Sequence, residues 1–135
     1  MNIIVCVEEK FGMSFGGRRL SQDRLLIDDL MKTVGNNRLL ISPYSKKLFN
    51  EYSNKIIVDA DFLIKAKSDD YCFVEINDFK DIKEEIGSII LYKWNRRYPA
   101  DLFFDSSYIE GREPISVSDF EGNSHKLITK EVYKL

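Results

Sequence analysis

Apolar residues recur along this chain in short runs that alternate with segments of helical spacing. Six runs rich in Ile, Val, Leu and aromatic residues predict strands at residues 2–7, 38–41, 55–58, 71–76, 88–92 and 101–104. The first run is apolar throughout, which is typical of a strand covered on both faces. We therefore expect it at the centre of a sheet, with Val5 and Val7 facing one side and Cys6 the other.

The segments between these runs have the spacing of helices. Residues 22–34 repeat apolar side chains at helical intervals, Ser21 is the expected N-cap, and Gly35 stands where a helix commonly ends. Ser42 followed by Pro43 predicts the start of a second helix. Two shorter helices, each opened by an aspartate, are expected at residues 59–66 and 78–87. This alternation predicts a mainly parallel sheet with helices on both faces.

The pattern changes in the last third of the chain. Beyond residue 101 the helix signals stop, and residues 115–117 and 126–133 read as extended segments with interleaved polar positions. The longer of the two alternates as a half-exposed antiparallel strand does. Residues 1–135 are therefore expected to form a single α/β domain whose mainly parallel central sheet ends in C-terminal antiparallel strands.

Composition narrows the classes of function. A chain of 135 residues needs no disulfide or metal to fold, and its net charge of −2 argues against a general nucleic-acid binder, which requires clustered cations. Cys6 and Cys72 both fall in apolar runs and are expected to be small buried hydrophobes. No apolar run approaches ~18 residues and the start lacks a basic signal region, so we expect a cytoplasmic protein without a membrane partner.

Two stretches of the chain resemble dihydrofolate reductase. The first is the N-terminal unit: a strand, a glycine loop and an acid-bearing helix from Ile3 to Val34, with Gly12, Met13 and Asp23, followed by the strand Leu39 to Ile41. The second is the tail, Gly122-Asn123-Ser124-His125, which leads into the last strand. The resemblance implies a three-layer α/β sandwich. It also implies an NADPH-dependent reductase acting on a pterin-like or pyrimidine-like substrate.

Three side chains acquire roles from the resemblance. Asp23 matches the carboxylate that hydrogen-bonds and helps protonate the pterin, a role for which burial would raise its pKa toward the working pH. Ser42 and Ser45 match the helix start that receives the cofactor phosphate, where free backbone N–H groups bind anions. An ordinary explanation stays open for each: Asp23 would complement the helix dipole, and Ser42 would only cap a helix.

The chain departs from that family at two places. Gly17-Arg18-Arg19 replaces a Pro-Trp segment, and Lys93-Trp94-Asn95-Arg96-Arg97 follows residues 89–92 where the resemblance implies a Gly-Gly turn. Both changes argue against NADPH and folate as ligands. The chain is also similar to short proteins labelled ribonuclease Z, a label that we expect to be wrong. That function needs a His-x-His-x-Asp-His metal motif, and this chain has a single histidine, His125, expected as a surface or capping residue.

Basic residues form two clusters, each next to a predicted strand or helix start: Arg18, Arg19 and Arg24, and Lys93, Arg96 and Arg97. If both loops lie at the carboxyl ends of the strands, their guanidinium groups would converge on one anionic ligand. Trp94, with Tyr92 and Tyr98, would supply a stacking surface for a base. The alternative is solvated loop charge around a buried tryptophan.

Three functions fit these observations. The first is a dihydrofolate-reductase-like domain that binds a small anionic, nucleotide-type ligand through Arg18, Arg19, Ser42, Ser45, Trp94, Arg96 and Arg97. The second is an NADPH-dependent reductase with Asp23 as its acid. The third is a protein-interaction domain that keeps the fold and uses the aromatic and basic residues around Trp94 as a contact surface.

Overall fold

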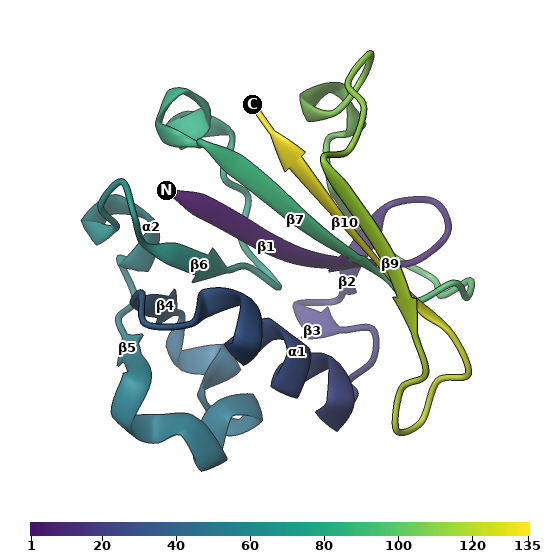
Figure 1. Ribbon diagram of the computed structural model, residues 1–135, viewed down its shortest axis with the longest axis horizontal. Helices are drawn as coiled ribbons and strands as arrows, with labels where there is room; N and C mark the ends of the chain where they lie inside the picture. The colour runs from purple at the N-terminus through teal and green to yellow at the C-terminus, as the bar shows by residue number, and fades with distance from the viewer.

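A seven-stranded twisted sheet organises the protein (Figure 1), and the computed structural model describes residues 1–135 except the side chain of Ser53. The strands of this sheet are β1 (Asn2–Val7), β4 (Leu39–Ile41), β5 (Ile56–Val58), β6 (Tyr71–Phe73), β7 (Ser88–Lys93), β9 (Ser116–Phe120) and β10 (Ile128–Lys134). Their order is β5-β4-β6-β1-β7-β10-β9. Strands β5, β4, β6, β1 and β7 run parallel, whereas β10 pairs antiparallel with β7 and with β9.

Strand β1 lies at the centre of this sheet, between β6 and β7. Ile3 pairs with Cys72 on one side and with Ile89 on the other. Val5 and Val7 are fully buried in the core on one face, while Cys6 packs against the core on the opposite face. These pairings and this burial confirm the predicted central strand. Its apolar run follows from its position, since a strand covered on both faces buries the side chains of both faces.

The long helix α1 (Arg24–Val34) lies across one face of the sheet (Figure 1). Its predicted N-cap was wrong by two residues: the side chain of Asp23, not of Ser21, accepts hydrogen bonds from the N–H groups of the first turn. A carboxylate satisfies these free amides and complements the positive end of the helix dipole. The predicted C-terminal glycine is confirmed, since Gly35 has a φ of 58° and its N–H donates to the carbonyl of Met31.

Two layers cover the faces of the sheet. Helix α1 and the kinked 3-10 helix η1 (Pro43–Lys55) pack on one core, through Leu26, Leu30 and Phe49. The other face is covered by short elements: α2 (Phe62–Lys65), η2 (Lys80–Glu85), η3 (Ser106–Tyr108) and a small sheet of β2 (Gly12–Phe15), β3 (Arg18–Arg19) and β8 (Leu102–Phe103). The result is the expected three-layer α/β arrangement.

Several elements differ from their predictions. The second and fourth predicted helices are kinked 3-10 helices, η1 and η2, and the third is reduced to the four residues of α2. The run at residues 101–104 does not join the main sheet, because β8 pairs antiparallel with β2 in the small sheet. The fourth predicted strand ends at Phe73; the Val74 N–H still donates to the Ile4 carbonyl, and the chain leaves the sheet at Glu75. The antiparallel strands expected at the C-terminus are confirmed as β9 and β10.

Candidate functional site

The candidate site lies where α1 begins and the turn before β10 crosses it. Asp23 Oδ1 accepts hydrogen bonds from the N–H groups of Leu25 at 3.0 Å and Asn123 at 2.9 Å, and Oδ2 accepts from the Ser124 N–H at 2.8 Å. Gly122 makes this approach feasible, because a Cβ there would stand 2.5 Å from Asp23 Oδ2. The tail therefore closes directly over the helix start.

These contacts determine the ionisation of Asp23. Burial alone would raise its pKa, but hydrogen bonds from the N–H groups of Asn123 and Ser124, from His125 and from the Leu26 N–H together lower the pKa well below its usual range. The expectation that burial raises this pKa toward working pH was wrong. Four donors stabilise the charged form, so Asp23 is ionised at neutral pH.

His125 is buried, which corrects its prediction as a surface or capping residue. Only 4% of its surface is exposed, and its ring stacks on Trp94 with centroids 4.5 Å apart. Its Nδ1 lies 2.9 Å from Asp23 Oδ2, and its Nε2 lies 2.9 Å from Ser21 Oγ and 3.4 Å from the Tyr98 hydroxyl. Sequence reasoning missed this role because the partners of His125 come from distant segments.

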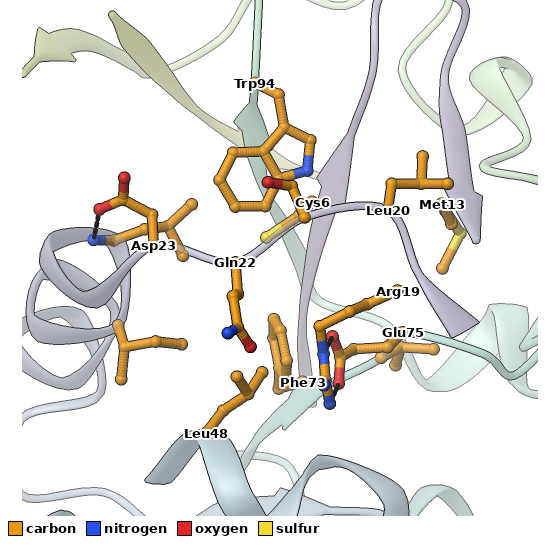
Figure 2. Close-up of a pocket in the computed structure, with 14 residues that line it drawn as sticks. Cys6, Met13, Arg19, Leu20, Gln22, Asp23, Leu48, Phe73, Glu75 and Trp94 are labelled. Atoms are coloured by element: carbon orange, nitrogen blue, oxygen red, sulfur yellow. Dashed lines mark hydrogen bonds and ion pairs between the residues drawn. The ribbon is translucent and has the colours of Figure 1, made fainter. Parts of the chain in front are cut away.

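A small cavity lies beside these groups, lined by Ser21, Trp94 and mostly apolar side chains. Figure 2 shows the Gln22 side chain reaching into it, while the Asp23 carboxylate turns toward the helix start. Its volume is about 20 Å³, which is room for roughly one water molecule. In this conformation the cavity admits a small group but not a pterin or a nucleotide ring.

Glu75 closes the opposite wall of this cavity. Its carboxylate accepts two hydrogen bonds from the Arg19 guanidinium, at 2.8 and 3.0 Å, and one from the Ser45 hydroxyl at 2.7 Å. The guanidinium also lies over the Tyr44 ring, 4.6 Å from its centroid. Arg19 and Ser45, both predicted ligand-binding residues, are thus held by an internal carboxylate. The signal in the sequence for Glu75 was a carboxylate inside the otherwise apolar run predicted as a strand at residues 71–76.

The remaining predicted residues lie elsewhere. Arg97 borders a surface depression with Glu8 and Lys10, and Arg96 Nη2 donates to the Ser124 carbonyl at 3.3 Å. Arg18 is exposed in β3. Ser42 is buried at the start of η1 and its side chain makes no capping hydrogen bond. The structure therefore does not gather the four predicted arginines around one cavity, because Arg19 and Arg97 line different pockets.

An open groove adjoins the closed cavity, between α1 and η1. It measures about 570 Å³ and shares with the cavity Gln22, Asp23, Ile27 and Leu48. This volume falls within the range of about 300–1,000 Å³ that small-molecule sites occupy. The groove carries charges of both signs, from Arg24, Asp28, Lys47 and Glu51.

The described residues offer neither a metal cluster nor a membrane span. Among them, no group of three or more His, Cys, Asp or Glu side chains is placed to hold a metal ion. None of their helices combines the length and the apolar character that crossing a bilayer requires.

Comparisons with known proteins give a structural match and no sequence match. No family model and no curated protein matches the sequence, and none of the comparisons points to ribonuclease Z. Among solved structures, dihydrofolate reductase from Enterococcus faecalis, complexed with NADP(H) and RAB-propyl, matches with a TM-score of 0.68 and 9% identity. The match covers 98% of this chain and 94% of that one. This chain therefore has a dihydrofolate-reductase-like fold.

Proposed function

We propose that this domain binds a small anionic ligand of nucleotide type in the groove between α1 and η1. The observation that carries the proposal is the groove itself, about 570 Å³ in volume and adjacent to the cavity beside Trp94. A solved neighbour of the same fold is a complex with NADP(H). A nucleotide has the size for such a groove, with its phosphates at the open end.

Two exposed cations suit the phosphate end of the ligand. Arg24 lies on the α1 wall of the groove and Lys47 on the η1 wall. Both project into solvent, and neither side chain is engaged in an ion pair among the described residues. Arg24 can bind a phosphate through two parallel hydrogen bonds, and Lys47 supplies a point charge. We propose Arg24 and Lys47 as the anion contacts in place of Arg19 and Ser45, because Arg19 and Ser45 already donate hydrogen bonds to Glu75.

The carboxylates in the groove suit the sugar of a nucleotide. Glu51 and Asp28 line its wall, and a carboxylate is an acceptor for hydroxyl groups. Asp28 Oδ1 already accepts a hydrogen bond from the Tyr52 hydroxyl, which fixes its orientation. The groove thus offers both cations for phosphate and carboxylate acceptors for hydroxyl groups.

The other two functions have less support. A reductase needs Asp23 to deliver a proton, but its carboxylate accepts backbone hydrogen bonds and its pKa is held below the usual range. NADPH still belongs among the nucleotides to test, because the neighbour binds NADP(H). An interaction surface around Trp94 lacks its main residue, since Trp94 is 4% exposed.

A thermal-shift panel followed by titration calorimetry tests the proposal. We expect ATP, AMP or NADPH to raise the melting temperature in proportion to its concentration, because a ligand of the folded state stabilises it. Adenosine, which lacks phosphate, should bind at least tenfold more weakly. Absence of binding by every nucleotide, or equal binding of adenosine, would contradict the proposal.

A charge reversal on η1 identifies the groove. Lys47→Glu should weaken the nucleotide by more than tenfold, since a charged hydrogen bond contributes about 1.5–3 kcal/mol. Lys46→Glu is the matched control, because Lys46 is the neighbouring exposed lysine of the same helix and does not line the groove. Equal losses in the two variants would place the ligand elsewhere.

A further inference from the structure

Ser21, His125 and Asp23 form a hydrogen-bonded row at the edge of the closed cavity. Ser21 Oγ lies 2.9 Å from His125 Nε2, and His125 Nδ1 lies 2.9 Å from Asp23 Oδ2. The side chains of Asp23 and His125 are 0% and 2% exposed, whereas Ser21 is half-buried and lines the cavity. Nucleotide binding in the outer groove makes no use of this row.

The chemistry of Asp23 sets the direction of these hydrogen bonds. An ionised carboxylate only accepts, so the proton of neutral His125 is on Nδ1 and points at Asp23. Nε2 then carries a lone pair, and the Ser21 hydroxyl donates to it. This tautomer follows from the network of partners. The serine proton is thus directed at a base.

Surrounding contacts hold the imidazole in this orientation. Trp94 stacks on the ring at an interplanar angle of 29°, and the Ser124 hydroxyl lies 3.2 Å from Nδ1. An aromatic face also stabilises the imidazolium that forms when the base takes up a proton. Asp23 is itself fixed by backbone N–H groups of Asn123 and Ser124, so the row is rigid at its inner end.

We propose that Ser21 is a nucleophile for acyl transfer from small esters or thioesters, with His125 as its general base and Asp23 as the positioning residue. The triad arrangement of serine, histidine and aspartate is recognised by geometry and roles, not by order along the chain. The cavity at Ser21 has apolar walls from Met13, Leu26 and Phe73. Its small volume, about 20 Å³, excludes bulky acyl groups.

The reaction has two balanced steps. Ser21 Oγ forms a bond to the acyl carbon and its proton passes to His125 Nε2; the carbon–oxygen or carbon–sulfur bond of the donor then breaks, and the leaving group takes that proton. An acyl-Ser21 ester remains. Water next attacks this ester while giving a proton to His125, and collapse releases the carboxylic acid and returns the proton to Ser21 Oγ.

Acylation by p-nitrophenyl acetate tests the proposal directly. We expect mass spectrometry of the wild-type protein to find acetyl on the peptide that contains Ser21, and Ser21→Ala to lose this adduct. His125→Gln should slow p-nitrophenol release by about a hundredfold or more. Ser118→Ala, on the distant strand β9, should react as wild type does. Acetyl found only on lysines, or equal rates with and without His125, would overturn the proposal.

The role of Asp23 has its own readout. The side chains that face His125 are those of Asp23, Ser21, Ser124, Tyr98 and Trp94. Asp23 is the one carboxylate among them. Asp23→Asn removes the negative charge that stabilises the imidazolium, so the pH at which acylation is half-maximal should move to lower values. A variant that slows acylation without moving this pH would reduce Asp23 to a packing role and contradict its assignment.

If acylation is too slow to follow, the Ser21→Cys variant tests activation by His125 through the rate of thiol alkylation. Burial raises the pKa of Cys6, and it raises the pKa of Cys72 to about 12, so the native thiols give a slow background. Ser21→Cys should react with iodoacetamide at neutral pH at least tenfold faster than the double variant Ser21→Cys/His125→Gln. Equal alkylation rates would show that His125 does not activate this position.

Discussion

Two carboxylates, Asp23 and Glu75, line opposite walls of one closed cavity and are stabilised in different ways. Backbone N–H groups and a histidine hold Asp23, whereas a guanidinium and a serine hydroxyl hold Glu75. The main-chain N–H groups that bind Asp23 cannot move away from it without unfolding the turn before β10, which carries two of them. Side-chain donors can change rotamer, so the Glu75 wall is the one that can open to admit a larger ligand.

The Asp23 wall should produce the largest effect. Asp23→Ala leaves the N–H groups of Leu25, Asn123 and Ser124 without their buried acceptor. We expect the free energy of unfolding to fall by about 3–5 kcal/mol, the range for breaking a buried charged contact. Urea denaturation measures this. Asp69→Ala, at an exposed position, should stay within ~0.5 kcal/mol of wild type.

The Glu75 wall should produce a smaller effect. Glu75→Gln weakens the contact with Arg19, and we expect a loss of about 1–3 kcal/mol. Combining it with Arg19→Met should restore part of the stability, because replacing both partners of a buried pair is commonly close to neutral. A double-mutant cycle by urea denaturation gives the coupling. Additive losses would show that the two side chains do not depend on each other.

A pH series tests whether the charge of Asp23 is the source of its effect on stability. The pKa of Asp23 is lowered by folding, so its charged form contributes stability above the pKa of about 3.9 in the unfolded chain. That contribution is lost as pH falls through the lower folded pKa. The stability difference between wild type and Asp23→Asn should be full at pH 6–7 and shrink below about pH 4. A difference that stayed constant down to pH 2 would rule out the charge as its source.

Much of the fold was predictable because it depends on local pattern. The apolar run at residues 2–7 indicated the central strand, and the helical spacing to Val34 with Gly35 after it indicated α1. The resemblance of the N-terminal unit and tail to dihydrofolate reductase agrees with the solved neighbour of that fold. Local pattern indicated a strand at residues 101–104 but not its partner: β8 pairs with β2 in the small sheet and not with the main sheet.

The candidate site was predictable only in part. Asp23 was identified from its place at the helix start, but its partners Asn123, Ser124 and His125 come from about 100 residues further along the chain. The four arginines were expected to converge on one pocket, yet Arg19 and Arg97 line different pockets. Spacing along the chain carries no information about which loops meet.

The sequence by itself determined which segments become strands and helices, because hydrophobic periodicity and helix capping act over a few residues. Only the tertiary structure decided that Glu75 neutralises Arg19, that His125 is buried under Trp94, and that Ser21 faces it. The physical reason is that a buried polar group takes its hydrogen-bond partner from whichever segment packing brings within about 3 Å.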